Sequence, residues 1–577
     1  MEKNEESALQ AHINQKANLI WSIADKLTGV FKPHEYDEVI LPMMVIKRFD
    51  TILEPTKDAV LKKYEEVKNL PLKDTFLTKV TGHQFYNVSR FTLAKLLDTP
   101  DSIEANFNDY LNGFSDNVKD IIDNFDFDRF MSRLVENDLL YIIIQEFCSP
   151  NADLHPDKIS NLEMGYIFEE IIRRFSEAHN EDAGQHYTPR EVIRLMVNIL
   201  FSNDDSILTE NTAKTLYDPT VGTGGMLSVA QEYLRSLNSS AQLVCYGQEI
   251  NAQTYAICKS DMLIKNDNAD NICKGNTLSD DKFAGDTFDY ILSNPPFGRE
   301  WKKEKADVEK EAKQGFAGRF AMGLPPVSDG QMLFLQTAVA KMKPEGAKVA
   351  IIQNGSPLFS GDAGSGQSEI RRYLLENDLL EAIVALPNDL FYNTGIATYI
   401  WVLNNKKSPE RRGKVQLINA NNMYVKRRKS LGNKRNDIPE NYIRDITNIY
   451  GEFKESEVSK IFNNEDFGYT KVVVERPMKD ENGKAILKKG KPTPDTSLRD
   501  TENVPLNEDI DAYFEREVKP FAPDAWMDRT KDKIGYEIPF TRYFYKYTPP
   551  KPSDDIMAEI KELEKSLDGV LKDVFNG

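Results

Sequence analysis

The tetrapeptide Asn294-Pro295-Pro296-Phe297 has residue types suited to holding a planar amino group. The Asn294 side-chain oxygen and a prolyl carbonyl can each accept one N–H of the same amino group. Two prolines restrict the backbone so that both acceptors face outward, and Phe297 offers a face on which an extruded base can stack. Accepting both hydrogens turns the nitrogen lone pair toward a methyl donor. A Pro-Pro turn without a ligand is the alternative for this tetrapeptide taken alone.

A glycine-rich turn lies upstream, between Asp218 and Met226. Glycine lets a backbone approach a ligand closely, and the N-terminus of the helix expected at 226–237 presents free N–H groups to an anion. The turn therefore predicts a site for the anionic group of a ligand, although many α/β proteins carry such a turn for geometric reasons alone. The turn residues expected to touch the ligand are Thr220, Gly222, Thr223, Gly224 and Gly225.

Two cofactor classes compete for this turn, a dinucleotide and S-adenosylmethionine. The dinucleotide fingerprint is G-x-G-x-x-G with an acidic residue about 20 positions later. Here the spacing is Gly-x-Gly-Gly, and the acidic residue Glu249 comes noticeably later. A carboxylate at Glu249 can accept both ribose hydroxyls, while Asp218 can face an ammonium group that a dinucleotide does not possess. S-adenosylmethionine is therefore favoured.

A doubly wound α/β sheet between residues 160 and 420 is expected to position these motifs. Short β-rich runs alternate there with helical patterns at 226–237 and 332–342, which is typical of parallel strands covered by helices. The expected strands are 215–217, 243–247, 290–293, 348–352, 381–386, 398–403 and 415–420. The last two lack an intervening helix and are expected to form an antiparallel edge. Another strand should end before Asn276 and Thr277, which either contact an adenine ring or form a plain polar turn.

The expected fold is therefore α/β and Rossmann-like, flanked by two other regions. Residues 1–155 have apolar positions at helical spacing and predict an all-helical domain, in which Pro42 should kink or break a helix. The catalytic domain is expected over 156–425 and a C-terminal region over 426–577.

The C-terminal region carries two local signals. Asn482-Gly483 predicts a hairpin between the runs 472–475 and 485–488. Apolar residues at alternating four and three spacing predict a terminal helix at about 553–575. That helix either packs on its own domain or forms a seam for a partner chain.

Length and charge limit the function classes. A chain of 577 residues is long enough for two to four domains. Its net charge of −18 argues against a protein that grips a long duplex unaided, because phosphate contacts need clustered Lys and Arg. Basic stretches at 406–414 and 426–435 could contact phosphate, although a charge run is usually a solvated face.

The composition also argues against several other classes. Four cysteines without a C-x-x-C pair, and only six histidines, argue against structural zinc and a disulfide framework, so no metal is expected. No apolar run reaches the roughly 18 residues of a membrane helix, and the start lacks the pattern of a signal peptide, so a cytoplasmic protein is expected. There is no G-x-x-x-x-G-K-[ST] phosphate loop.

In these motifs the sequence resembles the amino-methyltransferases with an Asn-Pro-Pro-aromatic motif, and within them the modification subunits of type I restriction-modification systems. The resemblance covers most of the chain and includes 390–396, 431–434 and 467–470. It also includes a Thr-Pro segment upstream of the glycine turn, which in the family helps to hold the cofactor. That segment consists of Gln185, His186, Tyr187, Thr188, Pro189 and Arg190. Two departures from the pattern, His186 and Thr220-Val221, concern the cofactor contacts and not the reaction.

The resemblance implies methyl transfer from S-adenosylmethionine to the N6 nitrogen of adenine in double-stranded DNA, with the target base flipped out. It also implies a separate specificity subunit that chooses the DNA sequence, with two copies of this chain on each such subunit, and a restriction subunit for translocation and cleavage. Two other functions stay open: methylation of an RNA base or a protein glutamine, and a non-catalytic scaffold that binds the cofactor.

Overall fold

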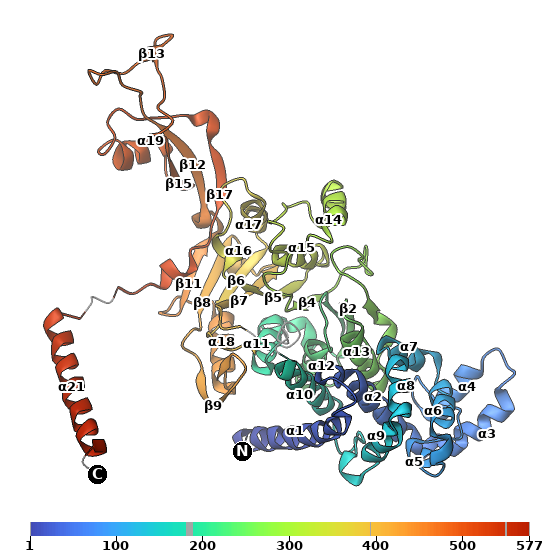
Figure 1. Cartoon of the computed structure of the whole chain (residues 1–577). Helices are drawn as coiled ribbons and strands as arrows, with labels where there is room; N and C mark the ends of the chain where they lie inside the picture. The colour runs from blue at the N-terminus through green and yellow to red at the C-terminus, as the bar shows by residue number, and fades with distance from the viewer. Residues whose placement is uncertain (1, 180–187, 393, 548–550, 576–577) are drawn as a thin grey trace. The chain divides into compact units, whose positions relative to one another are not determined.

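The computed structural model describes residues 2–179, 188–392, 394–547 and 551–575. Within them a nine-stranded sheet occupies the middle of the chain, in the order β11-β8-β6-β7-β5-β4-β1-β2-β3 (Figure 1). The strands are β1 (Ala213–Asp218), β2 (Gln242–Glu249), β3 (Ile272–Lys274), β4 (Tyr290–Ser293), β5 (Lys348–Asn354), β6 (Leu380–Ala385), β7 (Thr398–Asn404), β8 (Lys414–Asn419) and β11 (Ser459–Asn463). The expected α/β, Rossmann-like class is confirmed.

The half of the sheet that carries the motifs is parallel. Strands β3, β2, β1, β4 and β5 pair in parallel with one another, in that order. Their carboxyl ends therefore lie along one edge of the sheet, which in open α/β sheets is the edge where ligands bind.

The other half corrects the expectation for 398–403 and 415–420. Strand β7 is antiparallel, as expected, but it lies between β5 and β6 instead of at the edge. Strand β8 pairs in parallel with β6, and the antiparallel edge strand is β11. All seven residues of β7 are buried, which agrees with a central position, because a strand covered on both faces is a continuous apolar run.

The helices of this part of the chain pack on the sheet or on one another. They are α10 (Asn161–His179), α11 (Arg190–Phe201), α12 (Gly225–Leu237), α13 (Ala252–Ile264), α14 (Lys305–Ala312), α15 (Gln331–Ala340), α16 (Ser356–Phe359), α17 (Gly366–Glu376) and α18 (Glu440–Glu452). Helix α12 shows why they form: Met226, Leu227, Ala230 and Leu234 recur at helical spacing and are buried.

The segment before the sheet is helical in the structure, as expected. Its helices are α1 (Glu2–Ala24), α2 (Asp37–Leu53), α3 (Lys57–Val67), α4 (Lys73–Thr81), α5 (Leu93–Leu96), α6 (Ile103–Asn112), α7 (Asp116–Asn124), α8 (Asp128–Glu136) and α9 (Leu139–Phe147). Of the two outcomes expected at Pro42, a break is wrong, because α2 continues through it, and a kink stays a prediction. Nearly all of α2 is buried, and this packing offsets the one backbone hydrogen bond that a proline removes.

A small sheet follows, and it corrects the hairpin expected around Asn482-Gly483. Residues 472–475 belong to β12 (Gly468–Glu475), which pairs with β15 (Asp500–Pro505), β16 (Trp526–Met527) and β17 (Lys533–Tyr536) and not with 485–488. The turn itself is present, closed by a bridge between Lys479 and Ala485. Two short hairpin pairs also occur, β9 (Val425–Leu431) with β10 (Lys434–Asp437) and β13 (Leu487–Lys488) with β14 (Lys491–Pro492). Helix α19 (Ile510–Tyr513) completes this part.

Residues 539–577 form a separate unit from residues 1–538. Within it α20 covers Phe540–Phe544 and α21 covers Ser553–Phe575, so the expected terminal helix is confirmed. The apolar side chains of Ile556, Ile560 and Leu563 are exposed. Among the described helices of the whole chain, none has the length and apolar character to cross a membrane.

Candidate functional site

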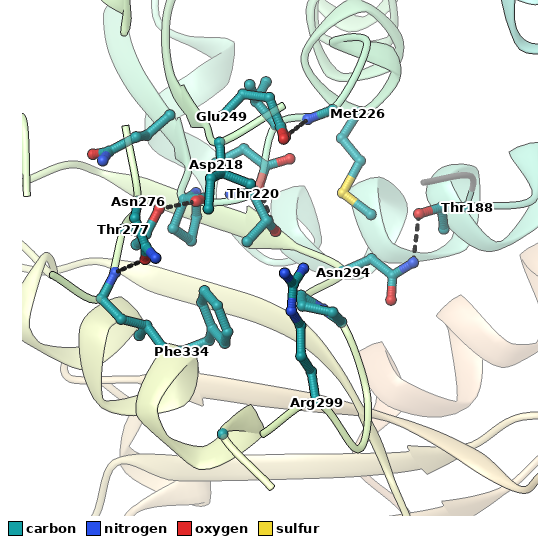
Figure 2. Close-up of a pocket in the computed structure, with 18 of the residues that line it drawn as sticks. Thr188, Asp218, Thr220, Met226, Glu249, Asn276, Thr277, Asn294, Arg299 and Phe334 are labelled. Atoms are coloured by element: carbon teal, nitrogen blue, oxygen red, sulfur yellow. Dashed lines mark hydrogen bonds between the residues drawn. The ribbon is translucent and has the colours of Figure 1, made fainter. Parts of the chain in front are cut away.

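A cavity lies at the carboxyl ends of β1, β2 and β4, against the start of α12 (Figure 2). It encloses about 1090 Å³ of space, including its open mouth, which is ample for a nucleoside-sized ligand. Most of the sequence-predicted site residues line it, although they come from five separate segments. Those residues are Thr188, Asp218, Thr220, Gly222, Thr223, Gly225, Glu249, Asn276, Thr277, Asn294 and Pro296.

The glycine turn needs its glycines for two different reasons. Gly224 has φ +85°, and a Cβ there would lie 2.8 Å from the Cys258 Sγ. At Gly225 a Cβ would instead lie 2.8 Å from the Glu169 Oε1. No side chain caps the helix that starts at Gly225, so its first N–H groups are available to an anionic ligand group.

Asp218 is a buried carboxyl group at the end of β1, with 1% of its surface exposed. Burial raises its pKa to about 7, an effect that the backbone N–H of Thr220 opposes and the charge of Glu249 reinforces. That N–H donates to the Asp218 Oδ1 at 2.9 Å. A cationic ligand group would lower this pKa by favouring the carboxylate, so Asp218 suits an ammonium group.

Glu249, at the end of β2, is held by the backbone on both of its oxygens. The N–H of Gly222 donates to Oε2 at 2.8 Å and the N–H of Asn251 donates to Oε1 at 2.8 Å. Each carboxylate oxygen can accept a further hydrogen bond. The carboxylate is thus fixed at the cavity wall and still able to accept hydroxyl groups.

Asn276 and Thr277 also line the cavity, but their side chains are engaged in hydrogen bonds with other parts of the protein. The Asn276 Oδ1 accepts the N–H of Leu278 at 3.0 Å, and its Nδ2 donates to the Glu304 Oε1 at 2.8 Å. The Thr277 hydroxyl donates to the Pro219 carbonyl at 2.5 Å. Their predicted contact with an adenine ring stays a prediction.

Asn294, directly after β4, has one half of its amide paired and the other half unpaired. Its Nδ2 donates to the Thr188 Oγ1 at 2.8 Å, as Figure 2 shows. Its Oδ1 is buried and has no hydrogen-bond partner among the described residues. A buried acceptor without a donor costs about 1–3 kcal/mol, and because Asn294 lines the cavity, this oxygen is a candidate acceptor for a ligand N–H.

Other predicted residues do not line the cavity. Phe297 is half-buried, and its ring meets the Phe391 ring edge-on at 6.3 Å. The Arg190 guanidinium lies 3.1 Å from the centre of the Tyr166 ring. Pro295 is buried and Pro189 immediately precedes α11. Gly224 lies behind the turn, against Cys258. The predictions for Gln185, His186 and Tyr187 fall outside the described residues.

The structure adds residues that the motifs did not reveal. Glu169, from α10, lines the cavity, and burial raises its pKa to about 7 while Arg190 opposes the shift. The sequence did offer a signal for Glu169, because it is an acidic residue on an otherwise apolar face of its helix. Arg299 and Phe334 also line the cavity, and Figure 2 shows the Arg299 guanidinium pointing into it.

Metal ligands were not expected, and the described residues contain no group of three or more His, Cys, Asp or Glu placed to hold a metal ion. The four cysteines are free thiols.

Comparison with known proteins agrees with the class of cofactor site that the geometry indicates. The family model for N-6 DNA methylases matches residues 160–483, more than half of the chain, and that for the HsdM N-terminal domain matches residues 16–147. The MjaIX methylase subunit of a type I restriction enzyme from Methanocaldococcus jannaschii is 26% identical over 481 residues, 79% of this chain and 80% of the relative. The HindI methylase subunit from Haemophilus influenzae is 29% identical over 269 residues, 46% of this chain and 56% of the relative.

Solved structures share the fold. The methyltransferase subunit of a type I restriction-modification system from Streptococcus thermophilus superimposes with a TM-score of 0.63 at 22% identity, covering 79% of this chain and 97% of that one. A chain from a type I restriction-modification complex covers 97% of both chains with a TM-score of 0.52 at 18% identity. The chain belongs to the N-6 DNA methylase family, and its two matched domains make it a methylase subunit of the type I restriction-modification kind.

Proposed function

We propose that this chain methylates the N6 nitrogen of adenine in double-stranded DNA and that the residues described above are its working parts. The observation that carries the proposal is the unpaired, buried Oδ1 of Asn294 in a cavity shared with Asp218 and Glu249. An acceptor without a donor, at the end of β4, fits an amino group that arrives with the substrate.

The residues of the cavity fit S-adenosylmethionine, the cofactor of this family. Asp218 would face its ammonium group, Glu249 its ribose hydroxyls, and the uncapped start of α12 its carboxylate. When bound, the cofactor supplies an electrophilic methyl group on a sulfonium. A raised pKa at Asp218 supports this assignment, because a carboxyl group strained by burial gains most from a cationic partner.

The protein's contribution to the reaction is positioning and charge stabilisation. Asn294 would accept one N–H of the adenine amino group through Oδ1, and the Pro295 carbonyl would accept the other. Both acceptors stabilise the positive charge that develops on the nitrogen as it attacks. Holding the base and the cofactor in line supplies much of the remaining rate, and Phe297 would stack on the flipped base.

The relatives are named as methylase subunits of type I restriction enzymes, which supports a multisubunit assembly here too. In this proposal a specificity subunit supplies the DNA sequence preference, two copies of this chain bind it, and a restriction subunit joins them. The exposed side chains of Ile556, Ile560 and Leu563 support α21 as a docking helix. Removing the residues after Pro552 should abolish co-purification with the specificity subunit, and unchanged co-purification would exclude α21.

Two further parts of the proposal rest on the sequence. The domain boundaries are kept at 155/156 and 425/426. A chromosomal DNA substrate places the chain in the cytoplasm.

Nucleoside analysis tests the function directly. The full chain, assembled with its specificity subunit, is incubated with duplex DNA and cofactor labelled on the methyl group. Label in N6-methyladenosine from the DNA is the expected result. Label in RNA or in protein glutamine would identify a different methyltransferase, and absence of even one turnover would leave a cofactor-binding scaffold.

A further inference from the structure

We infer that the exposed basic side chains of the hairpin formed by β9 and β10 bind the phosphate backbone of the DNA beside the flipped adenine. This hairpin, residues 425–437, is called the basic hairpin below. The inference rests on the proposed function, because it needs a duplex substrate at the cavity. It assigns a phosphate-binding surface that lies outside the cavity itself.

The basic hairpin concentrates unpaired positive charge on a chain whose net charge is −18. Four of its basic side chains are exposed and have no ion-pair partner among the described residues. These four are Lys426, Arg428, Lys429 and Arg435. A local positive surface on an acidic protein selects an anionic partner, since the rest of the surface repels one.

The other two basic residues of the hairpin show the contrast. Arg427 donates to both oxygens of Asp437 at 2.6 and 2.7 Å. Lys434 is buried, and its ammonium group is paired with Glu191 of α11. These two residues hold the hairpin together and in place, while the four exposed ones have no such structural partner.

The hairpin is attached directly to the segment beside the base-binding motif. The N–H of Asn433 donates to the Tyr392 carbonyl at 2.8 Å, and the N–H of Arg435 donates to the Asp389 carbonyl at 2.8 Å. Phe391, next to Tyr392, packs its ring against Phe297 of the Asn-Pro-Pro-Phe motif. The pair of Lys434 with Glu191 adds a second attachment, to the helix that follows Thr188 and Pro189.

This position fits a duplex from which one base has been extruded. The phosphates on either side of a flipped nucleotide lie outside the pocket that receives the base, and Lys and Arg are the side chains that neutralise them. An acidic protein surface is the other partner that such charges could bind. DNA is favoured because the hairpin is attached to the segment 389–392, whose Phe391 packs against Phe297 of the base-binding motif.

The test replaces the four exposed basic residues by glutamine: Lys426→Gln, Arg428→Gln, Lys429→Gln and Arg435→Gln. A matched control removes the same charge from another exposed hairpin, β13 and β14 with their flanking turns: Lys484→Gln, Lys488→Gln, Lys489→Gln and Lys491→Gln. The full chain, with its specificity subunit, is titrated onto a labelled DNA duplex by fluorescence anisotropy over a series of salt concentrations. Cofactor affinity, measured by calorimetry, shows that each variant is folded.

Each phosphate contact adds about 0.9 to the slope of log affinity against log salt. The basic-hairpin variant should therefore lose about 2 to 4 from that slope and bind at least about tenfold more weakly at low salt. The control variant should keep the wild-type slope. Equal slopes for wild type and basic-hairpin variant, or an equal loss in the control, would overturn the inference.

Two further outcomes separate the possible errors. A hairpin variant that fails to co-purify with the specificity subunit, while the chain alone keeps its affinity for DNA, would show that the surface binds protein. If the wild-type protein methylates DNA and the basic-hairpin variant binds DNA as tightly as wild type, only the inference about the hairpin is wrong. Wild-type protein that leaves DNA unmethylated overturns the proposed function itself.

Discussion

Thr188 accepts a hydrogen bond from the Nδ2 of Asn294 at 2.8 Å. This contact engages the NH₂ group and holds the side chain in place, while the buried oxygen has no partner among the described residues. The resemblance to known families placed Thr188 among the residues that hold the cofactor. In the structure Thr188 lines the cavity and is also joined to the residue that would hold the base.

Replacing Thr188 by valine should therefore impair the chemical step more than cofactor binding. Loss of one hydrogen bond of about 1 kcal/mol, and of the amide orientation it sets, predicts a kcat lower by roughly five- to tenfold. Thr188→Ser keeps the hydroxyl and should restore most of the rate. Tritium transfer from labelled cofactor measures kcat, and calorimetry measures the cofactor Kd. A tenfold loss of cofactor affinity with unchanged kcat would show that Thr188 holds the cofactor and does not position the base.

Asn294→Ala should nearly abolish methyl transfer while cofactor binding survives. The substitution removes the acceptor that positions the amino group and stabilises its developing charge, an effect of about 10²–10³ in rate for comparable oxyanion-site donors. None of the contacts assigned to the cofactor passes through this side chain. Single-turnover transfer and calorimetric titration on the same preparation give the two quantities. Lost cofactor affinity with retained activity would show that the role is misassigned.

Asp218 predicts a specific dependence on pH. Its pKa in the folded chain is about 7, against 3.8 for an ordinary exposed aspartate carboxyl group. A raised folded pKa means that the folded state holds its proton longer than the unfolded state does. Its contribution to stability is therefore present below about pH 4 and is lost as the pH rises toward 7.

Asp218→Asn removes the titrating carboxyl group, so the variant should not lose stability as the pH rises from about 4 to 7. Between about pH 4 and 7 the free energy of unfolding of the variant should rise relative to wild type, by at most about 4 kcal/mol. The affinity of wild type for S-adenosylmethionine should increase over about pH 5.5 to 7, as the carboxylate forms, and that of the variant should stay weak and flat. Urea unfolding and calorimetry at several pH values measure both. Parallel pH profiles for the two proteins would contradict the assignment.

Some features of the fold were predictable because they depend on local pattern. Apolar runs and turn residues identified the ends of β1, β2 and β4 to within a few residues, and these ends carry Asp218, Glu249 and Asn294. The position of β7 was not predictable in this way. Its antiparallel direction follows from the absence of a connecting helix, but its insertion between β5 and β6 is a choice of pairing partner made by the whole sheet.

The site also combines features that local sequence predicts with features that depend on packing between distant segments. Residue types and spacing predicted the glycine turn and the Asn-Pro-Pro-Phe motif. The contact of Thr188 with Asn294 joins residues 106 positions apart, and the approach of Glu169 to Gly225 depends on how α10 packs on α12. The contact of the Phe297 ring with Phe391 was likewise not visible in the motif, and the stacking of Phe297 on a base stays a prediction.

Gly224 offers a test of the turn that supports the whole site. Gly224 has φ +85°, and a Cβ would lie 2.8 Å from the Cys258 Sγ, whereas Gly29 has φ +90° and nothing within 4 Å. Gly29→Ala should therefore cost only the backbone strain of about 1 kcal/mol. Gly224→Ala adds a steric clash with a buried thiol and should cost roughly 1–3 kcal/mol more.

The double variant Gly224→Ala with Cys258→Ala isolates the clash. If the sulfur is the obstacle, removing it should recover most of the extra loss, and the two substitutions will not be additive. Cofactor affinity should follow the same order, since the turn presents the N–H groups at the start of α12 to the ligand. Thermal unfolding and calorimetry of wild type, the two single variants and the double variant complete this double-mutant cycle. Strict additivity would mean that the cost at Gly224 comes from its backbone conformation alone.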